Sequence, residues 1–75
     1  MPIDNEQQAM AAIEAWRGAP LQAQLRYLQE ARGSLELSAM YYEQKGNELG
    51  AARVSRCLAL LQTRQDELSK QDKIQ

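Results

Sequence analysis

The most constraining feature of this chain is an apolar pattern with helical spacing that runs through most of its length. Apolar residues follow one another at steps of three, four or seven, first from Leu21 to Tyr42 and then from Val54 to Leu68. Residues at these spacings share one stripe of a helix, and an apolar stripe needs a second helix to shield it from water. The pattern therefore predicts an all-α chain whose helices pack against each other or against a partner.

Two breaks divide this pattern. Pro20 cannot sit inside a helix but fits its first position, so Gly18 and Pro20 mark the end of one helix and the start of the next. Gly46 can adopt the left-handed conformation that ends a helix, and Asn47 can cap the following one. These breaks predict three helices.

Gly33 lies inside the second helical segment. It could end a helix, with Ser34 capping another, but Leu28 and Leu35 are one heptad apart and keep the stripe in phase. We therefore expect a bent or kinked helix that continues through Gly33, at a cost of about 1 kcal/mol relative to alanine.

The expected fold is a helical hairpin, antiparallel and coiled-coil-like, preceded by a short helix. Asp4 and Gln7 have the spacing of a capping box at the start of the first helix, and Ala51 and Ala52 are expected to face inward in the last. The seam of the hairpin is predicted to contain Leu21, Leu25, Leu28, Leu35, Tyr42, Val54, Leu58 and Leu61. A single domain over 1–75 would comprise helices at 5–17, 20–45 and 48–70 and a frayed tail at 71–75.

Composition narrows the class of protein. Nine basic and ten acidic residues are scattered along the 75-residue chain, which disfavours binding to nucleic acid. No apolar run is long enough to cross a membrane, and the polar, acidic N-terminus is unlike a signal peptide, so we expect a cytoplasmic protein. A domain this small buries only about 60% of its surface on folding, so its stability is marginal. Association with another protein is the additional source of stability that the sequence permits.

The sequence contains few residues of the types that act in catalysis or bind metal ions. There is no histidine and only one cysteine, Cys57, which excludes an intramolecular disulfide and the common zinc sites. Cys57 lacks a neighbouring base and is expected to be a half-buried residue at the edge of the seam. We predict no catalytic, cofactor-binding or metal-binding residues and expect a protein that is not an enzyme.

The large side chains off the main stripe are the candidates for binding a partner. They are Trp16, Tyr27, Met40 and Tyr41. A helix with apolar residues on two faces needs two neighbours, and one of them can be another protein. In the alternative interpretation, each tyrosine ring lies along the edge of the core with its hydroxyl in water.

Part of the chain resembles the middle of a tetratricopeptide unit. The small residue, aromatic residue, turn glycine and alanine of that family are matched by Ala39, Tyr42, Gly46 and Ala51. Glu48 and Ser55 replace residues that are apolar in the family, and no second copy follows. The resemblance implies a hairpin that turns at Gly46.

In length, helical content, acidity and richness in Gln, Leu and Arg, the chain is also similar to the small helical-hairpin co-chaperones of type III secretion. Those proteins hold needle subunits unpolymerised. Together these features predict a non-enzymatic protein–protein interaction module, a chaperone or adaptor for a larger protein. The alternatives are a homodimeric helical-bundle regulator or scaffold, and a needle co-chaperone.

Overall fold

The computed structural model describes residues 3–74, and the side chains of residues 3–71. It contains three helices, α1 (Glu6–Trp16), α2 (Leu21–Gln44) and α3 (Glu48–Ile74). No strand occurs in the described part of the chain, so the predicted all-α class is confirmed. The molecule is a narrow rod with dimensions of 44 × 20 × 15 Å.

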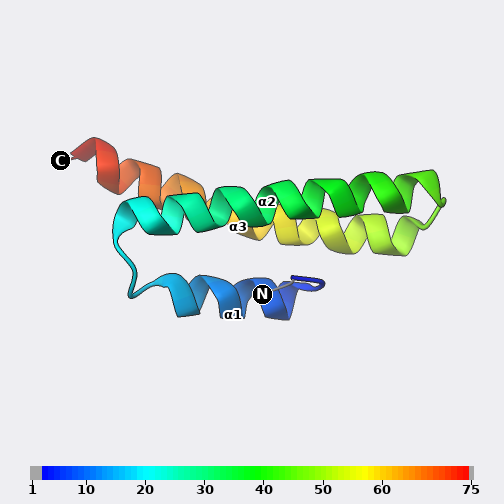
Figure 1. Cartoon of the computed structure of the whole chain (residues 1–75), viewed down its shortest axis with the longest axis horizontal. Helices are drawn as coiled ribbons and strands as arrows, with labels where there is room; N and C mark the ends of the chain where they lie inside the picture. Colours follow the sequence, from blue (N-terminus) through cyan, green and yellow to red (C-terminus); the bar gives the residue numbers. More distant parts are fainter. Residues whose placement is uncertain (1–2, 75) are drawn as a thin grey trace.

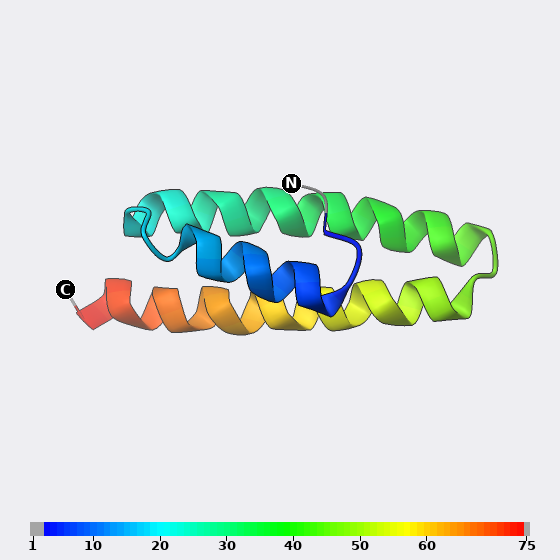
Figure 2. The ribbon, with the colours of Figure 1, turned by 90° about the horizontal axis from the view of Figure 1, so that it is seen from below.

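The two long helices lie side by side and define the rod. α3 returns along α2 after a short turn at residues 45–47 (Figure 1). The short helix α1 lies across the hairpin between the two long helices, and its contacts are mainly with α3 (Figure 2). A hairpin with a short N-terminal helix is therefore the arrangement observed.

The start of α1 differs by one residue from the predicted capping box. Asn5, and not Asp4, is the N-cap: its side-chain oxygen accepts a 2.8 Å hydrogen bond from the Gln8 backbone N–H. Gln8, and not Gln7, reaches back to accept from the Asp4 N–H at 2.7 Å. Both registers offer the same type of cap. The one adopted places Ile3 in the core, where its side chain is 8% exposed.

The predicted boundaries around α2 are close to those observed. α2 begins at Leu21, directly after Pro20, and continues through Gly33 without interruption. At its far end Gly46 has a φ of 71°, the left-handed conformation expected of a helix-ending glycine. Asn47 then caps α3 by accepting a hydrogen bond from the Gly50 N–H at 2.9 Å.

The C-terminal tail differs from the prediction. Sequence predicts that the last helix ends near residue 70, but α3 remains helical through Ile74. No glycine or proline follows Gly50, and Leu68 is buried two turns before the end, so nothing in the sequence stops the helix. Gln75 lies outside the described residues.

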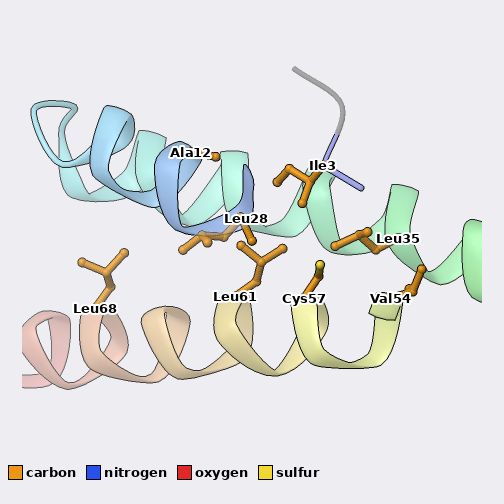
Figure 3. Close-up of a cluster of buried hydrophobic side chains, with 9 residues drawn as sticks. Ile3, Ala12, Leu28, Leu35, Val54, Cys57, Leu61 and Leu68 are labelled. Carbon is orange, nitrogen blue, oxygen red and sulfur yellow. The ribbon is translucent and has the colours of Figure 1, made fainter. Parts of the chain in front are cut away.

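The core is a continuous row of side chains between the three helices (Figure 3). Its buried apolar members are Ile3, Ala9, Ala12, Leu28, Leu35, Val54, Cys57, Leu61 and Leu68. The other predicted seam residues, Leu21, Leu25, Tyr42 and Leu58, are partly buried and pack against this row. Each fully buried leucine contributes about 1.5–3 kcal/mol, so this row supplies most of the stabilising free energy.

The inward stripe of α3 corrects two predictions. It passes through Gly50, Val54, Cys57, Leu61 and Leu68, at steps of four, three, four and seven. Cys57 is therefore completely buried and is not at the edge of the seam. The stripe bypasses the two alanines predicted to face inward: Ala51 is half-buried and Ala52 is exposed. The predicted stripe differs from the observed one here because alanine fits both an exposed and a buried helix position.

Two polar contacts cross the apolar seam. Gln24 is only 7% exposed; its Nε2 donates to the Ala19 carbonyl at 2.8 Å, and its Oε1 accepts from Arg64 at 3.2 Å. Arg32 donates to the side-chain oxygen of Gln65 at 2.6 Å. Buried polar groups are costly without partners, so these contacts favour one alignment of α2 with α3 over shifted ones.

The helix glycines should respond oppositely to alanine. Gly33 has open space where an alanine methyl group would lie, whereas a methyl on Gly50 would be 2.7–2.9 Å from ring atoms of Tyr42. Gly33→Ala should raise the free energy of unfolding by about 0.5–1 kcal/mol through helix propensity. Gly50→Ala should lower it by about 1 kcal/mol, because the ring must move. Urea denaturation monitored by circular dichroism measures both; equal effects would contradict the close packing of Tyr42 on Gly50.

The Gln24–Arg64 contact should show coupling in a double-mutant cycle. Gln24→Leu and Arg64→Leu should each destabilise the fold by about 1–3 kcal/mol, because each leaves a poorly solvated polar partner behind. The double variant should lose less than the sum of the two losses, by about 0.5 kcal/mol or more. Additive losses in thermal or urea unfolding would show that the two side chains do not depend on each other.

Candidate functional site

The four residues predicted to bind a partner form two separate pairs. Trp16 and Tyr27 lie at the junction of α1 and α2, with ring centroids 5.7 Å apart and an interplanar angle of 43°. Both rings are half-buried, and Trp16 packs against the core. Met40 and Tyr41 lie in the last two turns of α2 and are each 56% exposed. The structure brings members together within each pair and keeps the pairs apart.

Exposed apolar side chains gather at one end of the hairpin. Among the side chains described, five large apolar ones are strongly exposed: Met10, Leu37, Met40, Tyr41 and Leu49. Four of them lie within residues 37–49, next to the turn that joins α2 to α3. We call residues 37–53 the turn end of the hairpin.

Leu37, Met40 and Tyr41 form one contiguous patch on α2. They are related by steps of three and four, so they are neighbours on the helix surface. Leu37 is 68% exposed, more than either of its neighbours. Lys45 lies over the Tyr41 ring, with its Nζ 5.8 Å from the centroid, and places a positive charge at the edge of the patch.

Two of the four exposed apolar residues at the turn end are absent from the sequence-based prediction. Leu37 lies three positions before Met40 and could have been found by the helical spacing of the second apolar face of α2. Leu49 is 85% exposed. Its exposure was not predicted, because the cap residue and glycines next to it indicate a turn and a helix start and not an apolar surface. Its exposure depends on where α1 lies, which local pattern does not reveal.

The length of α1 explains why this end is uncovered. At 1.5 Å per residue its 11 residues span about 16 Å, whereas the 24 residues of α2 span about 36 Å. α1 covers part of the hairpin that is remote from the turn (Figure 2). The turn end therefore has no third helix.

Ion pairing fixes the N-terminal end of α1 on α3. The Arg56 Nε lies 2.7 Å from the Glu6 Oε1, across a gap of 50 residues in sequence. Further along, Met10 and Ile13 of α1 line a shallow hollow with Leu60 of α3. These contacts define the face of the hairpin on which α1 rests.

The described residues include one thiol and no histidine. No group of three or more His, Cys, Asp or Glu side chains is gathered among them in a way that could hold a metal ion. The helices in this described part of the chain include none that is both long enough and apolar enough to cross a membrane. Shallow hollows lie between α1 and α3, between α1 and α2, along α2, and at the turn that joins α2 to α3.

Cys57 is the one thiol, and it is inaccessible. Burial raises the pKa of the thiol above its ordinary value, and the negative charge of Glu6 acts in the same direction. The positive charges of Arg53 and Arg56 lower the pKa, and the negative charge of Asp4 raises it. The thiol is therefore neutral at physiological pH and serves as a small apolar group in the core.

No known protein family, curated protein or solved structure matches the chain.

Burial of Cys57 gives a pH prediction. Because the folded-state pKa is raised, the folded chain holds the thiol proton more tightly than the unfolded chain does. The stabilisation is complete below the unfolded-state pKa and is lost as pH rises toward the folded-state value. Unfolding free energies should therefore fall more steeply above about pH 8.5 in the native chain than in Cys57→Ala. Parallel pH profiles would contradict a raised pKa.

Thiol reagents at about pH 8 should modify Cys57 only as fast as the fold opens.

Proposed function

We propose that this chain is a small, non-enzymatic protein–protein interaction module, a cytoplasmic chaperone or adaptor that binds a larger protein by helix packing. The observation that carries this proposal is the concentration of exposed apolar side chains at the turn end of the hairpin. Contiguous exposed apolar surface in a small folded domain is characteristic of sites that contact other proteins.

The patch contains three apolar side chains that can serve as binding anchors. Burying Leu37, Met40 or Tyr41 against a partner contributes about 1.5–3 kcal/mol for each side chain, before the cost of association. The anchors sit on a helix that is held along its other side by the core. We infer that α2 and α3 pack as an antiparallel, coiled-coil-like pair, which keeps the anchors in a fixed arrangement.

The same surface could join two copies of this chain into a helical bundle, which is the alternative function. Sedimentation velocity distinguishes the two. We expect a monomer at about 10 μM, a concentration at which a functional homodimer with a micromolar or tighter dissociation constant would be substantially paired. The narrower hypothesis of a type III secretion co-chaperone predicts that a needle subunit is among the co-purifying proteins.

Two methionines of equal exposure provide a matched test. Met40 is 56% exposed at the turn end, and Met10 is 57% exposed on α1. After a partner has been identified by co-purification and made pure, Met40→Ser should weaken its binding by about tenfold, since a hot-spot truncation costs about 1–2 kcal/mol. Met10→Ser, which removes the same side chain elsewhere, should change binding less than twofold.

Binding is measured by isothermal titration, with circular dichroism confirming that both variants fold. If the double variant Met40→Ser and Tyr41→Ser binds the partner as tightly as the native chain, and Met10→Ser binds it more weakly, the binding site lies on the α1 side and not at the turn end. A chain that co-purifies with nothing and sediments as a dimer would favour the homodimer.

A further inference from the structure

The face of the hairpin that carries α1 continues beyond α1 toward the turn. On α3 this face follows one stripe at steps of four and three: Leu49, Arg53, Arg56, Leu60, Thr63 and Glu67. The part from Arg56 onward contacts α1 or lines a hollow with it. Leu49 and Arg53 lie on the same stripe, closer to the turn, and both are exposed.

The corresponding stripe of α2 is also bordered by α1 along one part and exposed near the turn. It contains Tyr27, Ala31, Ser34, Ser38, Tyr41 and Lys45, again at steps of four and three. Tyr27, Ala31 and Ser34 border a hollow with Trp16 of α1. Tyr41 and Lys45 lie past the end of α1 and are exposed. Two exposed apolar side chains, Tyr41 from α2 and Leu49 from α3, thus lie on the continuation of the surface on which α1 rests.

The charges on this extension are positive. Lys45 and Arg53 are the charged residues of the two stripes between α1 and the turn. The nearest carboxylates in sequence, Glu43 and Glu48, are two and five positions from them. At about 100° per residue, Glu48 projects about 140° away from Arg53 around α3, and Glu43 about 160° away from Tyr41 around α2. The extension therefore presents cations on the side where α1 lies.

The half of the face that α1 covers shows which kind of segment packs on this surface. α1 is a helix that packs through the fully buried small residues Ala9 and Ala12, and its Glu6 pairs with Arg56. Arg53 is the cation three positions before Arg56 on the same stripe. A helix that follows the line of α1 toward the turn would meet Arg53 as Glu6 meets Arg56.

We propose that the extension of the α1 face binds an acidic amphipathic helix of the partner protein. Its apolar positions pack on Tyr41 and Leu49, and its carboxylates pair with Lys45 and Arg53. Ser38, three positions before Tyr41 on the α2 stripe, adds only a short side chain to this surface. This proposal rests on the proposed function and specifies the chemistry of the partner.

A peptide library tests the charge of the occupant even before the partner is identified. The probe is a displayed library of helical peptides of about 15 residues, with leucines fixed at i, i+3, i+7 and i+10 and the flanking positions randomised. Selection on the full chain should enrich Asp and Glu at the flanking positions. Binding of the enriched peptides should weaken as salt rises from about 0.05 to 0.5 M.

Two charge reversals provide the matched control. Arg53→Glu should weaken binding of a selected acidic peptide by about tenfold, because an attraction becomes a repulsion. Lys70→Glu makes the same change in net charge at an exposed position near the other end of α3, and it should alter binding less than twofold. Circular dichroism of both variants confirms the fold.

The outcomes separate this inference from the proposed function. Selected peptides that are neutral or basic, bind Arg53→Glu as well as the native chain, and lose binding in Tyr41→Ser would overturn the acidic helix and keep the interaction module. Failure to enrich any helical peptide would overturn the acidic helix as well. Self-association that disappears in Tyr41→Ser would identify a second copy of this chain as the occupant.

Discussion

Burial of apolar side chains between α2 and α3 is the interaction on which the rest of the structure depends. Neither long helix could remain folded alone with its leucines in water, because helical stability in proteins comes mainly from packing of an apolar face. The turn at Gly46 brings the two stripes together, and Asn47 starts α3 in the required direction. The exposed patch at the turn end lies on this pair.

The polar contacts within the seam have a different role. Leucines at heptad spacing would pack nearly as well if one helix slid by about two turns, since the pattern repeats every seven residues. The Gln24–Arg64 and Arg32–Gln65 contacts do not repeat, and a slide would bury their polar atoms without partners. The close approach of Tyr42 to Gly50 adds a steric feature at the turn that also selects one alignment.

The candidate site arises from a mismatch in length. A third helix shields the face of the hairpin, but α1 is less than half as long as its neighbours and leaves the turn end without cover. The stripe pattern of both long helices continues into this uncovered part with apolar and cationic side chains. A partner helix placed there would complete a three-helix layer along the whole rod, which is the physical basis of the proposed interaction.

Local signals determined the all-α class, the three helices and most of the seam. Spacing of the leucines identified the buried stripe, and Gly18, Pro20, Gly46 and Asn47 located the breaks, because these effects act within a few residues. Where two neighbouring residues are equally good helix caps, the sequence does not decide between them. Asp4 was predicted as the cap of α1, but Asn5 is the cap observed. The helical tail does not follow from the apolar pattern, which ends at Leu68, although no glycine or proline interrupts the chain after it.

Tertiary structure alone decided which side chains remain exposed. Cys57 and Ala52 are both small, yet one is completely buried and the other faces solvent, because the exact crossing of α2, α3 and α1 sets the inward direction. Sequence grouped Trp16 and Tyr27 with Met40 and Tyr41, but Trp16 of α1 packs against Tyr27, whereas α1 does not extend as far as Met40 and Tyr41. Exposure depends on contacts between residues far apart in the chain, and a local pattern of spacing contains no information about where a third helix will lie.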